Sequence, residues 1–263
     1  MRSYWAIFTA RFRMLLQYRA AAVAGLVTQV FWGLLRMMIF GAFYGSGGGE
    51  QPMSCAQVVT YIWLGQAMFR LLPWMPDRGV QAMIRTGTVA YELVRPVRLY
   101  WLWYTRSLAD LTAPTLLRSV PMFVIALLFF DMQLPASPAA AGAWAVSTGL
   151  AVLLAASVMT LLTISMLWTI SGEGIANLTA AAVILLSGIV VPLPLFPDWA
   201  QPMLNVLPFR GIMDTPFRIY MGHLAPGAWA AALGHQLAWI VLLAALGRGV
   251  LARGVRRLVV QGG

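Results

Sequence analysis

Six long apolar stretches constrain the fold of this chain more than any other feature. They cover approximately residues 22–44, 57–74, 107–130, 140–170, 175–196 and 228–250. A helix needs about 20 residues to cross the ~30 Å hydrocarbon core of a bilayer, and most of the stretches are close to that length. Only 10% of the 263 residues are charged, against about 25% in a typical soluble domain. The sequence therefore predicts an all-α integral membrane domain over residues 1–263 with six transmembrane helices, since a helix pairs its backbone polar groups internally.

Positive charge is concentrated in alternate connections between these stretches. All 18 cationic side chains are Arg. Four lie in the first 21 residues and five in the segment 75–106, whereas 45–56 and 131–139 contain none. The positive-inside rule then places both termini in the cytoplasm of a bacterial cell, with the chain in its inner membrane. We therefore attribute the net charge of +10 to topology and to contact with membrane lipids, and we expect no nucleic-acid partner.

Three connecting segments are expected to form helices that do not span the bilayer. The first 21 residues have an amphipathic pattern, which predicts a helix lying in the membrane interface. A short cytoplasmic helix is predicted over 77–92, with Asp77 as its N-cap. The apolar, Pro-rich loop 197–227 is expected to form two short helices that dip back into the outer leaflet.

Charged residues inside the spans are the candidate substrate path, because a cation in the bilayer is costly unless it is solvated or paired. Arg36 could contact a polar substrate, or could pair or snorkel within the bundle. Arg70 is explained by snorkelling. Asp110 and Arg118 share one face of the third span, where they form either a polar stripe along a path or a self-neutralising helix start. An i,i+4 pair of Arg106 with Asp110 is also expected.

The sequence contains no motif for chemistry of its own. A phosphate-binding loop of the Gly-x-x-x-x-Gly-Lys type is excluded because Lys is absent, and neither a zinc-protease nor a serine-hydrolase motif occurs. Cys55 is the only cysteine, and the two histidines are too far apart to share one helix turn. We expect no catalytic, cofactor or metal site, so another chain or an ion gradient must drive any uphill transport.

A resemblance to a known family rests on the basic segment after the second span. Arg85-Thr86-Gly87-Thr88-Val89, followed by Glu92-Leu93-Val94-Arg95-Pro96-Val97, resembles the corresponding stretch of permeases of the ABC type-2 exporter superfamily. The order of elements is also similar, including a Pro-rich segment between the last two spans. The resemblance covers nearly the whole chain.

The resemblance implies an exporter that moves a lipid, drug, peptide or glycan with energy from a separate cytoplasmic ATPase. Two copies of that ATPase would bind ATP and Mg, and a second permease, identical or homologous, would complete the membrane part. The segment after the second span would be the coupling helix. The resemblance assigns ATPase coupling to Asp77, Arg78, Gln81, Arg85, Glu92, Arg95 and Glu173. It assigns an external gate to Pro192, Pro194, Trp199 and Pro208.

Three other classes of protein stay open at this stage. A secondary transporter or channel driven by an ion gradient usually needs acids near the membrane midplane, and the eight acids here lie mostly at span ends or in loops. A membrane enzyme needs a convergent catalytic set, which the sequence lacks. A passive scaffold subunit is compatible with the sequence.

Overall fold

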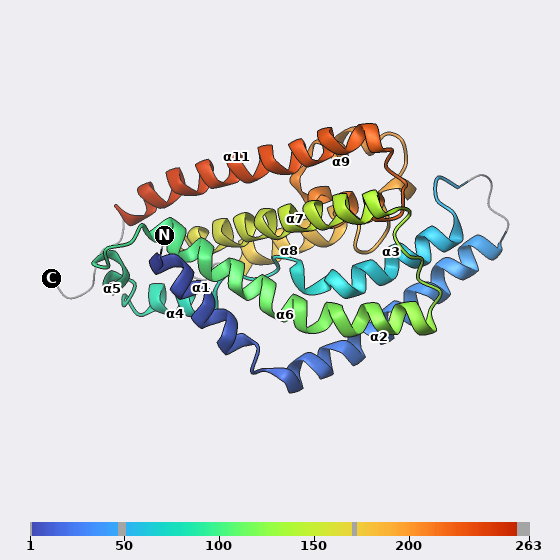
Figure 1. Cartoon of the computed structure of the whole chain (residues 1–263). Helices are drawn as coiled ribbons and strands as arrows, with labels where there is room; N and C mark the ends of the chain where they lie inside the picture. Colours follow the sequence, from blue (N-terminus) through green and yellow to red (C-terminus); the bar gives the residue numbers. More distant parts are fainter. Residues whose placement is uncertain (1, 47–50, 170–172, 257–263) are drawn as a thin grey trace.

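A computed structural model describes residues 2–46, 51–169 and 173–256, and every regular element in these ranges is helical (Figure 1). The elements in chain order are α1 (Arg2–Leu15), α2 (Arg19–Gly45), α3 (Cys55–Met68), η1 (Phe69–Leu71), α4 (Arg78–Arg85), α5 (Ala90–Leu93), α6 (Leu99–Phe129), α7 (Pro138–Ser165), α8 (Glu173–Leu186), η2 (Leu193–Leu195), α9 (Gln201–Val206), η3 (Pro208–Gly211), α10 (Asp214–Tyr220), η4 (Pro226–Ala228) and α11 (Trp229–Val255).

Four helices of the described chain are long and apolar enough to cross a membrane: α2, α6, α7 and η4 with α11. They coincide with the first, third, fourth and sixth predicted spans, although α6 begins eight residues earlier than expected. The second and fifth predicted spans correspond to α3 and α8. Each of these helices has 14 residues, or about 21 Å at 1.5 Å per residue, which is shorter than the hydrocarbon core.

The long helices lie side by side in one elongated bundle (Figure 1). Helix α7 runs through its centre and packs against α6, α10 and α11, while α3 packs against α6 and α2. Large side chains fill the interior, and both Trp63 and Trp103 are fully buried. The Trp63 ring stacks on Phe130 with 4.3 Å between centroids, which fixes α3 against the end of α6.

The two ends of the bundle differ in charge. One end, here called the basic end, contains α1, α4, α5, the start of α6 and the end of α11 (Figure 1). Its described arginines are Arg2, Arg11, Arg13, Arg78, Arg85, Arg95, Arg98, Arg106, Arg248, Arg253 and Arg256. At the opposite end Arg210 and Arg218 occur together with Asp198 and Asp214. The structure therefore gathers on one end the segments that the charge pattern assigned to one side of the membrane.

Helix α1 is shorter than the predicted amphipathic helix, because the backbone breaks between Leu15 and Arg19 and α2 leaves at an angle (Figure 1). Trp5, Phe8 and Phe12 stack in a row along α1, with centroid distances of 5.6 and 5.5 Å. Trp5 is 67% exposed. The other face of α1 packs against α6, so the helix keeps an aromatic ridge on its outer side.

The helix predicted over 77–92 is divided into α4 and α5. Asp77 caps α4 as expected, since its Oδ1 accepts hydrogen bonds from the backbone N–H groups of Gly79 (2.8 Å) and Val80 (3.3 Å). Helix α4 ends at Arg85 because Gly87 adopts a positive φ of 73°, a conformation that glycine adopts without steric cost.

Short helices occupy the loop 197–227, where two were predicted. Helix α9 is partly exposed, whereas most of α10 is buried against α7. Gln236 of α11 fixes this region to the bundle. Its Nε2 donates to the carbonyl oxygens of Gly211 (2.7 Å) and Ser147 (3.0 Å), and its Oε1 accepts from the Ser147 hydroxyl at 3.0 Å.

Candidate functional site

Helix α5 is attached to α6 through Glu92. The Glu92 carboxylate is buried and accepts hydrogen bonds from Arg106 Nη2 at 2.5 Å and from Trp103 Nε1 at 2.8 Å. The expected i,i+4 pair of Arg106 with Asp110 was therefore wrong. The sequence pattern considered only neighbours along one helix, and a carboxylate from α5 takes the place of Asp110.

Asp110 pairs instead with Arg11 of α1. Arg11 Nε lies 2.6 Å from Asp110 Oδ1 and Arg11 Nη2 lies 2.7 Å from Oδ2, so the guanidinium binds both carboxylate oxygens. Arg11 Nη2 also lies 3.1 Å from Asp77 Oδ2. Burial disfavours the charged guanidinium, but the hydrogen bond to Asp110 and the charges of Asp110 and Asp77 outweigh this and raise the pKa of Arg11.

Asp77 connects this charge cluster to a further helix. Its backbone N–H donates to Thr163 Oγ1 of α7 at 3.0 Å, while its carboxylate caps α4 and faces Arg11. A single residue thus joins α4 to α7 and α1. Val80 of α4 is fully buried in the small core at the basic end, so α4 is held to the bundle by apolar as well as polar contacts.

The residues proposed for ATPase coupling therefore divide into two groups. Arg78, Arg85 and Arg95 are exposed and Gln81 is half-buried. The side chains of Asp77 and Glu92 are buried and bind partners within the chain, so in this conformation they position the segment. Their part in ATPase coupling stays a prediction. Glu173 is the first residue of α8, and the adjoining turn 170–172 lies outside the described residues.

The sequence reasoning missed two apolar residues on the same surface. Tyr91 is 72% exposed and Val94 is 80% exposed, beside the exposed Arg95. Together with Met75, which is 56% exposed, they place apolar side chains among the arginines of the basic end. The spacing of polar and charged residues could not reveal them, because in a chain this apolar an exposed Tyr or Val cannot be told from a core residue by sequence alone.

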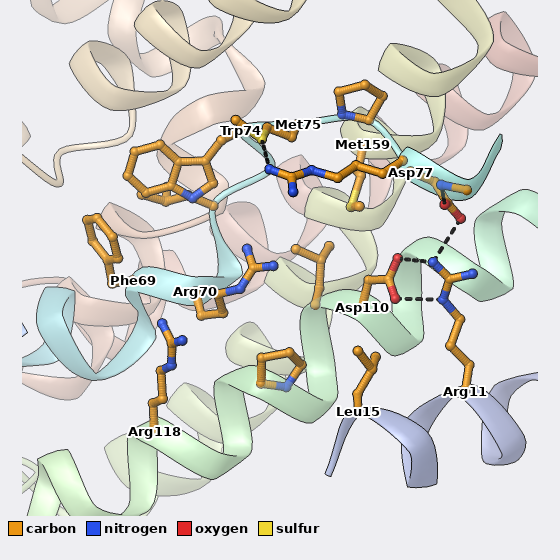
Figure 2. A pocket seen from close by; sticks show the side chains of 16 residues that line it. Arg11, Leu15, Phe69, Arg70, Trp74, Met75, Asp77, Asp110, Arg118 and Met159 are labelled. Carbon is orange, nitrogen blue, oxygen red and sulfur yellow. Dashed lines mark hydrogen bonds and ion pairs between the residues drawn. The ribbon is translucent and has the colours of Figure 1, made fainter. Parts of the chain in front are cut away.

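A cavity of about 600 Å³ lies between α1, α6, η1 and the segment that leads into α4 (Figure 2). We call it the arginine cavity. Its lining residues are Arg11, Leu15, Phe69, Arg70, Leu72, Trp74, Met75, Pro76, Asp77, Arg78, Gly79, Asp110, Leu111, Pro114, Arg118 and Met159. Two of the three predicted substrate-path residues, Asp110 and Arg118, are brought together here, and Arg70 joins them.

Arg36 lies elsewhere, in contact with α3 and the segment after α8. Its Nη1 donates to the carbonyl oxygen of Ile189 at 2.7 Å. With the Gln66 amide oriented to satisfy both of its neighbours, the Gln66 oxygen accepts from Arg36 Nη1 at 3.0 Å and its nitrogen donates to the Gln29 carbonyl at 3.1 Å. Arg36 is therefore paired within the bundle, the second of its two predicted interpretations.

The residues proposed for an external gate lie around η2, α9 and η3. Pro192 and Pro208 are buried, Pro194 is half-buried, and Trp199 is 80% exposed. Beside them, the Tyr61 hydroxyl of α3 donates to Asp214 Oδ1 at 3.1 Å, and Arg218 lies 3.6 Å from Asp214 Oδ2. The structure brings the prolines to one end of the bundle, while their role as a gate stays a prediction.

Within the described ranges, no group of three or more His, Cys, Asp or Glu side chains could hold a metal ion. The long apolar helices define a multi-pass membrane protein. The family model for ABC-2 family transporter protein matches residues 19–262. The chain belongs to this family and is therefore a permease component of an ABC transporter, a class whose membership implies association with an ABC ATPase. A comparison with curated proteins gave no match.

Proposed function

We propose that the chain is the membrane permease of an ATP-driven exporter, with six crossings and both termini in the cytoplasm of a bacterial cell. The short helices α3 and α8 would complete their crossings with the segments that follow them, η1 and residues 187–192. The basic end would face the cytoplasm, in accord with the positive-inside rule. The substrate would leave at the opposite end, past Pro192, Pro194, Trp199 and Pro208.

The attachment of the α4–α5 segment to the long helices carries this proposal. Glu92 joins α5 to α6, and Asp77 joins α4 to α7 and, through Arg11, to α1 and α6. A push on this segment would therefore be transmitted to α6 by charge-assisted hydrogen bonds, which resist displacement. It would reach α7 through the hydrogen bond of the Asp77 backbone N–H to Thr163 Oγ1. The exposed surface with Arg78, Arg85, Arg95, Tyr91 and Val94 is what a cytoplasmic ATPase would contact.

In the proposed mechanism two ATPase copies close on ATP and Mg, and closure moves the α4–α5 segments of two permeases. ATP would bind only to the ATPase.

The exposed surface of α2 supports contact with a second permease. Only 11% of the most apolar 18-residue stretch of this helix is buried within the chain, and its exposed residues are large. They include Val23, Val27, Phe31, Trp32, Met38 and Ile39. Lipid would cover the part of this face that the second permease leaves free.

Coupling to an ion gradient is disfavoured by the pairing of the acids. Four acids lie within ion-pair distance of an Arg: Asp77, Glu92, Asp110 and Asp214. A proton relay needs carboxylates that gain and lose protons during the cycle, and each of these four is held in an ion pair with an Arg.

The test is to co-express the chain with a candidate partner ABC ATPase and to purify through a tag on the permease. We expect the two proteins to co-purify, and Arg95→Glu to weaken the complex because it reverses an exposed charge on the contact surface. The control is Arg13→Glu, which makes the same charge reversal at an exposed position of α1. Active, ion-driven transport by the chain alone would refute the proposal.

A further inference from the structure

We propose that the arginine cavity binds the anionic head group of an amphiphile, a phosphate-type group that carries hydrocarbon chains. This inference deepens the proposed function, because it names the chemical class of substrate or resident lipid that the permease would accept from the inner leaflet. It rests on three features of the cavity: its charge balance, the arrangement of its arginines and the apolar character of the rest of its wall.

The charge balance of the cavity is positive. Four arginines line it, against two carboxylates. Arg11 is occupied by Asp110 and Asp77, and Arg78 is exposed, with its Nη2 3.5 Å from Met75 Sδ. For the remaining two, Arg70 and Arg118, the described part of the chain provides no carboxylate within 4.0 Å, the ion-pair distance. The protein thus holds two guanidinium groups in one cavity with no carboxylate in ion-pair contact, although Asp110 is close enough to Arg70 to act on it electrostatically.

Both of these arginines are partly withdrawn from solvent. Arg70 and Arg118 are half-buried, and Arg118 Nε is buried without a hydrogen-bond partner. A charged group removed from water is costly unless an opposite charge or hydrogen-bond acceptors replace the lost hydration. In Figure 2 the two side chains lie together on the side of the cavity away from the Arg11–Asp110 pair. The oxygens of one anion could therefore accept from both.

Arg118 is held in place by α2. Its Nη2 donates to the Ala21 carbonyl oxygen at 3.1 Å, and its guanidinium packs over Gly25 so closely that a methyl group at Gly25 would overlap it. The two anchors direct the guanidinium before any ligand arrives, and a planar guanidinium suits phosphate oxygens because it donates two parallel hydrogen bonds. Gly25 therefore belongs to the site, although it offers no group to a ligand.

The rest of the wall is apolar, which points to an amphiphile and not to a small inorganic anion. Phe69, Leu72, Trp74, Leu111 and Met159 line it. Arg118 is eleven residues before Phe129, the last residue of α6, or about 17 Å along the helix. If α6 spans the bilayer, the site reaches from the basic end into the hydrocarbon layer. A ligand there must have chains that lipid can solvate.

The experiment measures lipid retention by the purified full-length chain without ATPase, using native mass spectrometry after incubation with equal amounts of phosphatidylglycerol and phosphatidylcholine of the same chain length. We expect selective retention of phosphatidylglycerol. Arg118→Gln and Arg70→Gln should each reduce that selectivity by about tenfold, since each removes a charge-assisted pair. Arg13→Gln, which removes the same charge from exposed α1, should leave it unchanged.

Gly25→Ala keeps every charge of the chain and displaces the Arg118 guanidinium, so reduced selectivity in this variant identifies the geometry of the site as the cause. Its elution as a single species in size-exclusion chromatography shows that it is folded. A second arm adds inorganic phosphate in place of lipid. If phosphate alone displaces the lipid at equal concentration, the ligand is a free anion and the amphiphile is wrong.

Equal retention of phosphatidylglycerol by the wild type and both Gln variants would overturn the site altogether. Since the assay contains no ATPase, its result is independent of whether the chain couples to one. Failure of co-purification would instead count against the proposed function and leave lipid binding intact.

Discussion

Arg11 and Asp110, 99 positions apart in the sequence, form a two-point contact between α1 and α6 at 2.6 and 2.7 Å. The contact orients α1 on the bundle through a planar guanidinium and a planar carboxylate, a pairing more directional than a single ion pair. It also forms one wall of the arginine cavity (Figure 2). The position of the amphipathic helix and the charge of the cavity therefore depend on the same pair.

Replacing Asp110 with Asn should destabilise the protein by roughly 3 kcal/mol, because Arg11 would stay largely withdrawn from water without its main counter-charge. Thermal unfolding in detergent measures the effect, with Arg13→Gln as a control on the same helix. The double variant Arg11→Gln/Asp110→Asn should recover part of the loss, since it leaves no unpaired charge. Independent, additive effects of the two changes would show that the pair does not act as a unit.

Replacing Glu92 with Gln should uncouple α5 from α6 without preventing membrane insertion. Arg106 loses its carboxylate partner, and we expect the coupling between ATP turnover and transport to weaken by about 0.5–2 kcal/mol. The measurement is the amount transported per ATP hydrolysed by the reconstituted complex. An unchanged ratio would show that the Glu92–Arg106 contact does not transmit motion.

Arg85→Glu and Arg95→Glu test the surface of the same segment that we propose contacts the ATPase. Both residues are exposed, so charge reversal should lower the rate of transport-linked ATP turnover while the protein still inserts and folds. Membrane fractionation confirms insertion and a phosphate-release assay gives the turnover. If both variants hydrolyse ATP at the wild-type rate during transport, the ATPase binds elsewhere.

Gly188→Ala should destabilise the protein by about 1–3 kcal/mol. Gly188 has a φ of 90°, and a methyl group there would overlap the Tyr61 hydroxyl that binds Asp214. Gly142→Ala is the matched control, because no atom lies within 4 Å of its added methyl group and it sits inside α7. We expect the control to be neutral or slightly stabilising. Equal melting temperatures of the two variants would contradict this reading of the Gly188 turn.

Cys55, the sole cysteine of the chain, is exposed at the start of α3 and serves as a natural topology reporter. In intact cells a membrane-impermeant maleimide should label it, since the proposed topology places the end of the bundle opposite the basic end outside. A Cys55→Ser, Arg95→Cys variant should label only after permeabilisation. The reverse pattern would invert the topology.

The long helices could be predicted from the sequence because insertion into lipid depends on the average hydrophobicity of a whole stretch and not on individual contacts. Apolar stretches and the distribution of Arg located the long helices to within a few residues in most cases, and Asp77 was recognised as a cap from its place before a short helical pattern. The ends of α3 and α8 were less predictable, because prolines, glycines and short 3₁₀ turns break the apolar stretches inside the bundle.

The site was only partly predictable, because its contacts join residues far apart in sequence. Asp110 and Arg118 line one cavity, but their role in a substrate path stays a prediction. The partners of Arg106 and Asp110 come from α5 and α1, which no spacing rule connects. Arg70 was assigned to snorkelling because its position near a span end allowed it. Its place beside Arg118 depends on how η1 packs against α6.

At the end of the bundle opposite the basic end, the side-chain amide of Gln236 fixes η3 to the long helices α7 and α11. Bonded to both α7 and η3, it would have to leave an amide unsatisfied in an apolar interior if α11 slid along α7 by even one residue. If the proposed external gate opens on that side, we expect η3, α7 and α11 to tilt as one block, with the bending confined to the Pro192–Pro197 stretch that precedes them.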